Sequence, residues 1–162
     1  MGNSMNTISI RQADAADAVI VGTLVHTLIR EIVPEYEGRK PVEDYIDTAR
    51  ALLTTHAGIW AFLAENGSDV VGVLTLNQCA AIYAGGAFGE ICELYVAPDF
   101  RSSGVGAQLI DAAVEFGRSQ NWSVIEVGAP DVPRWQKSVD FYVSCGFDEI
   151  GPRLEFALSV NS

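Results

Sequence analysis

The sequence has no long apolar run and is poor in basic residues. None of its hydrophobic stretches approaches the ~20 residues of a membrane-spanning helix, so no membrane segment is expected. Lys and Arg together number 10 against 21 Asp and Glu, which gives a formal net charge of -11. So few cations argue against a nucleic-acid partner. The first residues, 1–6, lack the basic and apolar regions of a signal peptide, and we expect a cytoplasmic protein.

Cysteine and histidine are also scarce, with three and two residues respectively. Cys79, Cys92 and Cys145 each lie in an apolar stretch and are expected to be small buried hydrophobes in a reducing compartment. The chain has no Cys-x-x-Cys pair, and His26 and His56 are isolated. We therefore expect no metal site, and a Cys–His nucleophile has little support.

The composition is that of one folded domain. The chain has 162 residues, of which 49% are hydrophobic, and this is enough for a single core. Residues 1–5 are expected to be a flexible N-terminus or a remnant added for expression, and residues 6–160 to form the domain. No internal repeat, linker or low-complexity segment interrupts it.

The hydrophobic periodicity predicts an α+β fold with a mixed central sheet flanked by helices. Asn66-Gly67 is a strong hairpin signal, and Asp14 is a candidate helix cap. Strands are expected over Thr7–Gln12, Ile59–Ala64, Val70–Leu76, Phe88–Val96 and Ser123–Val127, with a final antiparallel pair at Phe147 and Arg153–Leu158. Helices are expected over Ala15–Ile32, Val42–Thr54 and Ser103–Gln120, followed by a last helix that Asp131 and Pro133 open and Gly146 closes. The predicted inward residues are Val19, Leu24, Leu28 and Ile32 in the first helix, Tyr45, Ile46, Ala49, Leu52 and Leu53 in the second, and Val105, Leu109, Ala112 and Phe116 in the third.

The segment Leu94–Ala107 is the most informative part of the chain. It reads as a strand, then a turn of small residues, then the start of a helix, which presents free backbone N–H groups to a phosphate. It is not a P-loop, because Ala107 and Gln108 follow Gly106. A dinucleotide-binding loop needs a third glycine where Leu109 stands, although Glu126 lies where a ribose-binding acid is expected. A nucleotide-binding oxidoreductase is therefore the weaker hypothesis.

A third phosphate motif matches in full. The run Arg-Ser-Ser-Gly-Val-Gly at 101–106, preceded by Leu-Tyr-Val-Ala-Pro-Asp-Phe, resembles the acetyl-CoA loop of the GNAT superfamily of N-acetyltransferases. A second block, residues 139–147, is similar to the family's Phe-Tyr-x-x-x-Gly-Phe segment. The resemblance covers roughly Ile59–Leu158. It implies a GNAT-like fold, acetyl-CoA as acetyl donor, and an amine acceptor.

The resemblance also implies how acetyl-CoA is held. The backbone of Leu94, Tyr95 and Val96 would pair with the pantetheine arm as if it were another strand. The amides of Ser102, Ser103, Gly104, Val105, Gly106 and Ala107 would hold the pyrophosphate, with Arg101 either adding a charge or remaining solvated. One departure is Trp135, which stands where the family often has an Asn that holds the pantetheine.

Direct transfer within a ternary complex needs a neutral amine. A lysine-like amine has a pKa of ~10.4, so a base or a water chain must remove its proton. Glu90 matches the base position of the family's histone-acetylating branch and is the preferred candidate, with Glu93 as its rival. Strand alternation places the two on opposite faces unless a bulge intervenes, and otherwise both are surface carboxylates. Tyr142 matches the acid that protonates the CoA thiolate; alternatively it is a core aromatic beside Trp135 and Val139.

The resemblance implies a small-molecule or peptide amine as the acceptor, and the acidic composition favours a cationic one. The segment Val33–Lys40 is the candidate rim of its site, through Glu35, Tyr36 and Glu37. A homodimer through the final strands is compatible with the pattern. A non-catalytic acyl-CoA-binding sensor or partner protein of the same fold is the alternative function.

Overall fold

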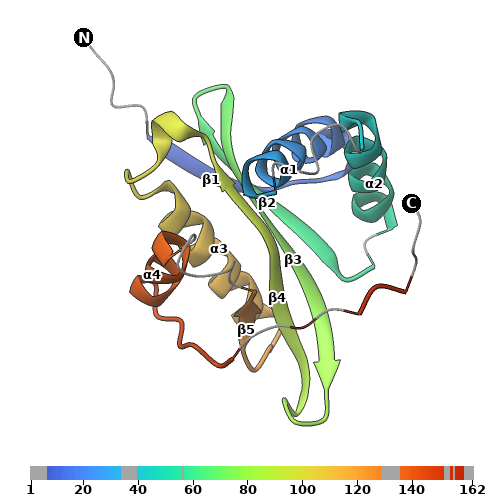
Figure 1. Cartoon of the computed structure of the whole chain (residues 1–162), viewed down its shortest axis with the longest axis vertical. Helices are drawn as coiled ribbons and strands as arrows, with labels where there is room; N and C mark the ends of the chain where they lie inside the picture. Colours follow the sequence, from blue (N-terminus) through green and yellow to red (C-terminus); the bar gives the residue numbers. More distant parts are fainter. Residues whose placement is uncertain are drawn as a thin grey trace. The chain divides into compact units, whose positions relative to one another are not determined.

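The computed structural model describes residues 7–33, 40–55, 57–128, 136–151, 154 and 156–158. The chain divides into two compact units, Met1–Val127 and Gly128–Ser162. The first contains a 5-stranded mixed sheet in the order β1-β2-β3-β4-β5 (Figure 1). Its strands are β1 (Ile8–Gln12), β2 (Ile59–Asn66), β3 (Asp69–Ala81), β4 (Gly86–Val96) and β5 (Ile125–Val127). Neighbouring strands are antiparallel as far as β4, whereas β4 and β5 are parallel. The predicted fold class is therefore confirmed.

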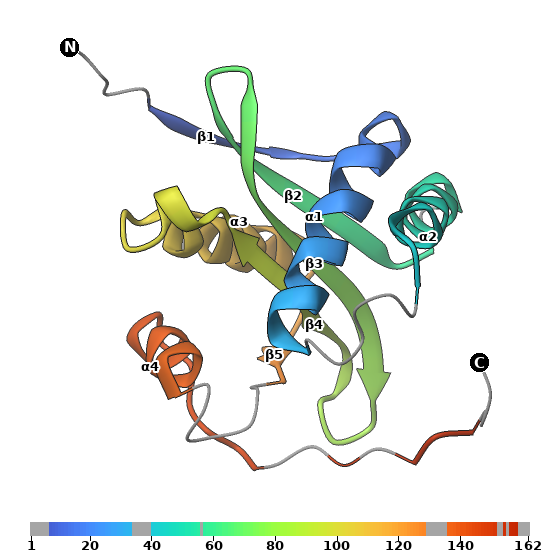
Figure 2. The same ribbon diagram turned by 45° about the horizontal axis from the view of Figure 1, so that its top comes forward.

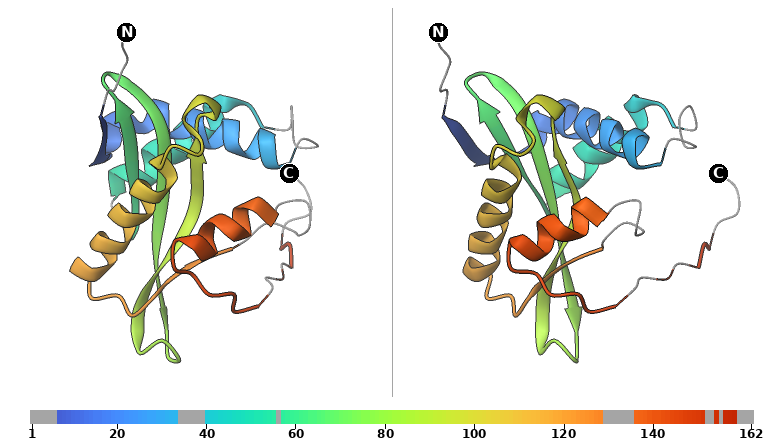
Figure 3. Two further views of the ribbon diagram at one scale, coloured as in Figure 1. Left: turned by 90° about the vertical axis from the view of Figure 1, so that its left-hand side faces the viewer. Right: turned by 60° about the vertical axis from the view of Figure 1, so that its left-hand side comes forward.

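Three helices cover the two faces of this sheet. The helices α1 (Ala18–Ile32) and α2 (Val42–Thr55) lie on one face and α3 (Val105–Ser119) lies on the other (Figure 3). Figure 2 shows α1 lying across the sheet with α2 at its side. No helix among the described residues is long and apolar enough to cross a membrane.

Each face has its own apolar contacts. On the α1/α2 face, the buried residues form one cluster, which comprises Ala13, Val21, Leu28, Leu53, Ala61, Leu63, Val73 and Tyr95. On the α3 face, the ring of Phe116 packs against Trp60, Phe62 and Trp122, with centroids 4.9, 5.5 and 5.6 Å away. Because side chains alternate along a strand, β2 contributes to both clusters, with Ala61 and Leu63 on the α1/α2 face and Trp60 and Phe62 on the α3 face.

The start of the first helical segment follows the predicted signal. Asp14 accepts a hydrogen bond from the N–H of Ala16, and its own N–H donates to the Asp17 carboxylate, both at 2.9 Å. This reciprocal cap closes a short 3-10 turn, η1 (Ala15–Asp17), from which α1 continues. Arg11 of β1 ties the cap to the sheet, because its guanidinium lies 2.8 Å from Asp17 and 2.9 Å from Glu65.

The prediction of an inward-facing side chain is wrong for two residues. Val19 is 55% exposed and Leu52 is 40% exposed. The 3-10 turn changes the phase of the helix, so that α1 buries Ala18, Val21 and Gly22 in its first half. Gly22 marks the crossing of α1 and α2: a Cβ there would lie only 2.5 Å from the Cα of Ile46. The close approach of the two helices therefore depends on a missing side chain, which an apolar-periodicity pattern does not register.

The other predicted helices and strands are confirmed, except the last pair of strands; Asp131 and Pro133, predicted to open the last helix, lie outside the described residues. The hairpin turn follows Asn66, and β3 and β4 extend past the predicted ends to Ala81 and Gly86. In contrast, the described residues beyond position 146 contain no strand. Of the predicted strand Arg153–Leu158, residues 153 and 155 lie outside the described residues, and Leu154 and Phe156 are 92% and 87% exposed. Alternation supplies an apolar face, whereas a strand also needs a hydrogen-bonded neighbour.

The second unit contains α4 (Gln136–Ser144). This helix closes as predicted at Gly146, which has φ +102. The N–H of Phe147 donates to the carbonyl of Tyr142 at 3.1 Å, and the N–H of Gly146 donates to that of Val143 at 3.0 Å. Such a left-handed glycine satisfies the last carbonyls and stops the helix.

We expect Gly22→Ala to destabilise the protein by about 2–3 kcal/mol, because the added methyl group meets backbone that must move. The matched control is Gly117→Ala in α3. There the nearest atoms, in Ile125 and Trp122, are side-chain atoms 3.0 Å away, which can adjust. Urea unfolding of the two variants measures the difference. Equal free energies of unfolding would contradict the role given to Gly22.

Candidate active site

The edge of β4 becomes free partway along the strand. β5 pairs only with Gly89, Glu90 and Ile91, so no described strand lies beside the rest of β4 on that side. The N–H of Ala97 donates to the carbonyl of Val71 at 2.8 Å and therefore points toward β3. Since successive backbone groups alternate, those of Val96 and Leu94 point to the free side. An extended polyamide chain can pair there as an added strand.

The turn after β4 exposes a row of amides. Arg101–Gly104 connect the short 3-10 helix Pro98–Phe100 to α3, and Ser102 and Gly104 have φ values of 64 and 91. Gly104 is the N-cap of α3 and provides no side-chain cap, and the first helical bond runs from Gln108 N–H to its carbonyl. Within the described residues, none of the N–H groups of 102–107 donates to a protein acceptor. Together with the positive end of the helix dipole, this row fits a diphosphate.

Arg101 is bound on the protein side of this turn. Its Nε donates to the Val96 carbonyl at 2.7 Å, and its Nη2 lies 3.0 Å from both carboxylate oxygens of Glu31 in α1. The guanidinium also lies 5.5 Å from the centroid of the Tyr95 ring. The positive charge that Arg101 could offer to the pyrophosphate is therefore partly neutralised by Glu31. Arg101 also joins the end of β4 to the last turn of α1.

A bulge in β4 decides where the two candidate bases lie. Leu76 of β3 is opposite Ile91, whereas the preceding residue, Thr75, is opposite Glu93. Cys92 is therefore the extra residue of a β-bulge. Without it, Glu93 would lie on the opposite face from Glu90. With it, both carboxylates lie on the face that α1 and α2 cover, and the bulge that the alternation argument allowed for is present.

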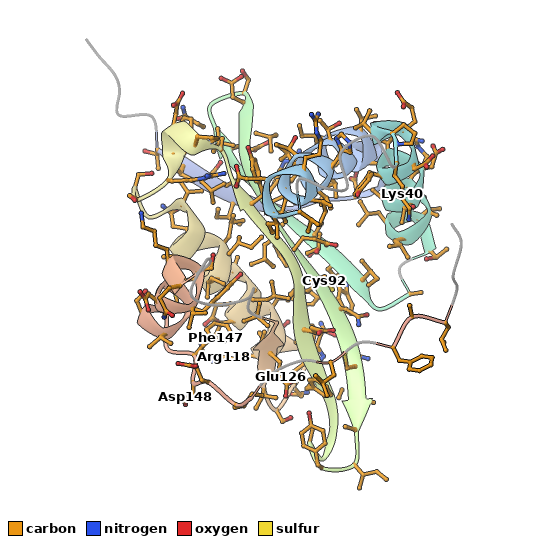
Figure 4. The ribbon with its side chains drawn as sticks, viewed as in Figure 1. Lys40, Cys92, Arg118, Glu126, Phe147 and Asp148 are labelled. Atoms are coloured by element: carbon orange, nitrogen blue, oxygen red, sulfur yellow. The ribbon has the colours of Figure 1, made fainter. Side chains whose placement is uncertain are left out.

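The bulge also exposes Cys92, which lies midway along β4 (Figure 4). The prediction of a buried thiol is wrong at this position, because the extra residue of a bulge falls outside the regular register that alternates side chains between the two faces. Cys79 and Cys145 are half-buried, and none of these three described cysteines forms a disulfide.

Glu93 is held by Thr75. The Thr75 hydroxyl donates to the Glu93 carboxylate oxygen Oε1 and accepts from the Glu93 N–H at 3.1 Å. Burial raises the pKa of the Glu93 carboxyl, and the hydrogen bond from Thr75 opposes that rise. A carboxylate whose pKa is raised toward neutrality is a better proton acceptor than an exposed one.

Glu90 lies among polar groups from three strands. It is opposite Asn77 on β3 and beside Glu126 on β5. Its Oε1 lies 4.0 Å from the Cys79 sulfur. Glu126 lies closer to the β3–β4 hairpin than Cys92 does (Figure 4), and it accepts a hydrogen bond of 3.1 Å from the Tyr83 hydroxyl. The α1/α2 face therefore carries three carboxylates along β4 and β5.

Tyr142 belongs to the second unit, on α4. Its ring contacts Phe141 and Phe147, with centroids 5.4 and 5.6 Å away. Burial, with a smaller contribution from Cys145, raises the pKa of Tyr142 to about 12. The phenol therefore keeps its proton across the physiological range and can act as a donor.

Four residues singled out for the predicted site lie outside the described residues: the rim residues Glu35, Tyr36 and Glu37, and Trp135. The sequence interpretation missed Thr75 and Glu31, and it noted Glu126 only as a ribose-binding candidate. No local signal identifies these residues, because each becomes relevant through pairing with a distant segment. The described residues hold no group of three or more His, Cys, Asp or Glu side chains that could bind a metal ion.

The chain is similar in sequence to known acetyltransferases. The sequence model of the Acetyltransferase (GNAT) family matches residues 25–147. An uncharacterized N-acetyltransferase of Archaeoglobus fulgidus is 29% identical over 128 residues, covering 74% of this chain and 80% of that protein. The chain therefore belongs to the GNAT acetyltransferase family, and it is an acetyltransferase. The hypothesis of a nucleotide-binding oxidoreductase is accordingly wrong.

Solved structures agree on the fold. An aminoglycoside acetyltransferase from an uncultured soil metagenomic sample, in complex with trehalose, has a TM-score of 0.77 at 20% identity, covering 96% of this chain and 98% of that one. The aminoglycoside N-acetyltransferase AAC(6')-Iy in complex with CoA has a TM-score of 0.74 at 18% identity, covering 98% of each chain.

We expect Gly104→Ala to lower the affinity for acetyl-CoA at least about tenfold. A Cβ at Gly104 meets nothing in the protein within 4 Å, so the methyl group projects into the space that a diphosphate needs. Gly67→Ala in the β2–β3 turn is the matched control, because Gly67 also has a positive φ and an open surrounding.

Both variants should lose about 1–2 kcal/mol of stability from backbone strain. Only Gly104→Ala should weaken binding, which titration calorimetry measures. Unchanged affinity in Gly104→Ala would show that the diphosphate does not lie at this turn.

Proposed function

We propose that this protein transfers the acetyl group of acetyl-CoA directly to an amine within a ternary complex. The observation that carries the proposal is the double use of β4. Its free edge and the open amides after it suit the pantetheine and diphosphate of acetyl-CoA, while its side chains Glu90 and Glu93 share one face. Acetyl-CoA supplies the activated acetyl group as a thioester, and the residues of this chain supply the proton transfers.

We assign the base to Glu93. Its burial favours proton uptake, and its carboxylate is fixed by Thr75. The acceptor enters as an ammonium ion; an N–H bond breaks, an O–H bond forms on Glu93, and the nitrogen lone pair becomes free to attack the thioester carbonyl. Glu90, the candidate that the sequence favoured for the base, is then placed to bind the ammonium group before it loses its proton.

Tyr142 is assigned to the leaving group. When the bond between the acetyl carbon and sulfur breaks, the carbonyl re-forms and the thiolate takes the phenolic proton. The nitrogen then gives up its second proton to the phenolate, which restores the phenol and leaves the amide. A phenol with a pKa of about 12 is protonated at neutral pH and can donate throughout the working range. This assignment rests on the family resemblance of residues 139–147.

We further propose a cationic acceptor. Glu90, Glu93 and Glu126 give the acceptor face a negative potential that attracts amines with more than one positive charge. One structural neighbour is an aminoglycoside acetyltransferase solved in complex with sisomicin, at a TM-score of 0.74. Aminoglycosides and polyamines are therefore the first acceptors to try, ahead of peptides.

Thiol release from acetyl-CoA in the presence of an amine panel tests the function. We expect turnover with multiply charged amines and a loss of about 100-fold in kcat for Glu93→Gln. Glu90→Gln should chiefly raise KM. Binding of acetyl-CoA without thiol release, across aminoglycosides, polyamines, amino acids and peptides, would instead support an acyl-CoA-binding protein.

We expect Tyr142→Phe to lower kcat about 100-fold while acetyl-CoA binds normally. Because the pKa of Tyr142 is about 12, the loss should be the same at pH 7 and pH 10. Phe141→Leu is the control for the aromatic packing around it. Steady-state kinetics and equilibrium binding give the two readouts, and full turnover in Tyr142→Phe would remove the residue from the acid role.

A further inference from the structure

Apart from the aromatic residues Tyr95 and Trp122, Thr75 is the one buried polar side chain among the described residues, at 7% exposure. It lies in the middle of β3, between the apolar residues Leu74 and Leu76. A buried hydroxyl in such a strand costs free energy unless it is hydrogen-bonded. Here both hydrogen bonds go to one residue, Glu93, through its N–H and its carboxylate.

The first of these bonds concerns the backbone. Cys92 shifts the register, so Glu93 rather than Cys92 comes opposite Thr75. The Glu93 N–H points to the Thr75 hydroxyl oxygen at 3.1 Å. The side chain of Thr75 thus satisfies a backbone donor at the bulge, and it stabilises the register that turns Glu93 to the α1/α2 face.

The second bond concerns the carboxylate. A threonine hydroxyl has one proton, and with its oxygen accepting from the Glu93 N–H, that proton is directed at Oε1 of the same residue. The carboxylate is held in one orientation, with Oε1 engaged by Thr75; in the proposed function this leaves Oε2 for the proton of the acceptor. A donor at Oε1 favours the ionised carboxylate, which is the form a base must have.

We propose that Thr75 is a positioning residue of the acetyl transfer: it fixes the bulge and the carboxylate of Glu93 together, so that the base is ionised and oriented before the amine binds. The inference rests on the proposed function of Glu93. Thr75 does not contact either substrate in this scheme and acts only through Glu93.

Other groups on this face do not replace Thr75 in this role. The other titratable or charged groups on this face come from the strands beside Glu93 and from the second half of α1. They are Cys79 on β3, Glu90 on β4, Glu126 on β5, and His26, Arg30 and Glu31 on α1. Glu31 is bound to Arg101. Burial and the Thr75 hydrogen bond are what shift the pKa of Glu93, and no charged side chain contributes.

The test compares Thr75→Val, which keeps the branched shape, with Thr75→Ser, which keeps the hydroxyl. We expect kcat to fall at least tenfold in Thr75→Val, and the acid limb of kcat/KM to move up by about one pH unit. Thr75→Ser should restore both. The affinity for acetyl-CoA should stay unchanged in both variants. Thr48→Val is the control, because Thr48 donates to a helix carbonyl, that of Asp44, on α2.

A readout independent of activity is the titration of Glu93, followed by carbon NMR of the labelled carboxyl group and assigned with Glu93→Gln. A higher titration midpoint in Thr75→Val than in the wild type supports the inference. An unchanged midpoint and acid limb overturn it, even where Glu93→Gln is inactive. If Glu93→Gln keeps full turnover, the assigned base is wrong, whatever the titration shows.

Discussion

The extra residue at Cys92 is the constraint on which the arrangement of the candidate site depends. A strand shows alternate residues to opposite faces, so one inserted residue exchanges the faces of everything beyond it. Ile91 lies opposite Leu76, on the α3 side, and Tyr95 packs in the cluster beneath α1 and α2. Both positions are fixed by apolar burial, and they fit together only if one residue between them is left out of the pairing. The register of Glu93 is therefore set by the two cores on either side of the sheet as well as by Thr75.

The bulge coincides with the end of the parallel pairing. β5 accompanies β4 as far as Ile91, and the extra residue follows immediately. Beyond Ile91, no described strand lies beside β4 on that edge, and the side chain of Glu93 adds a carboxylate to the α1/α2 face. The same short stretch can therefore present backbone groups along its edge to an extended cofactor and side chains from its α1/α2 face to an amine. Arg101 completes the connection, because it joins the last carbonyl of β4 to Glu31 of α1 and so ties the cofactor turn to a helix on the acceptor face.

Local signals predicted most of the fold, and pairing-dependent features account for the errors. The cap at Asp14, the hairpin at Asn66-Gly67 and the passage from strand to turn to helix at 94–107 each depend on neighbours in sequence. The bulge depends on which residue of β3 lies opposite each residue of β4, and no local pattern encodes this. The same reason explains why Thr75 resembled an ordinary strand residue and why Cys92 was expected to be buried. Val19 has a different cause, because the 3-10 turn before α1 changes the phase of that helix.

Burial of Glu93 has an energetic consequence that bears on the role of Thr75. The pKa of Glu93 is raised in the folded protein, so the folded state binds its proton more tightly than the unfolded chain does. The group therefore contributes stability below its unfolded pKa, and this contribution is lost as the pH rises through the folded pKa. At neutral pH, a half-buried carboxylate weakens the fold in the range where a base must be ionised. The hydrogen bond from Thr75 acts in the opposite direction, since it stabilises the ionised form. A solvent-exposed carboxylate would avoid the conflict, but it would be a weaker base and would lack a fixed orientation. The Thr75–Glu93 pair combines a raised proton affinity with an ordered, charged carboxylate, which burial alone does not provide.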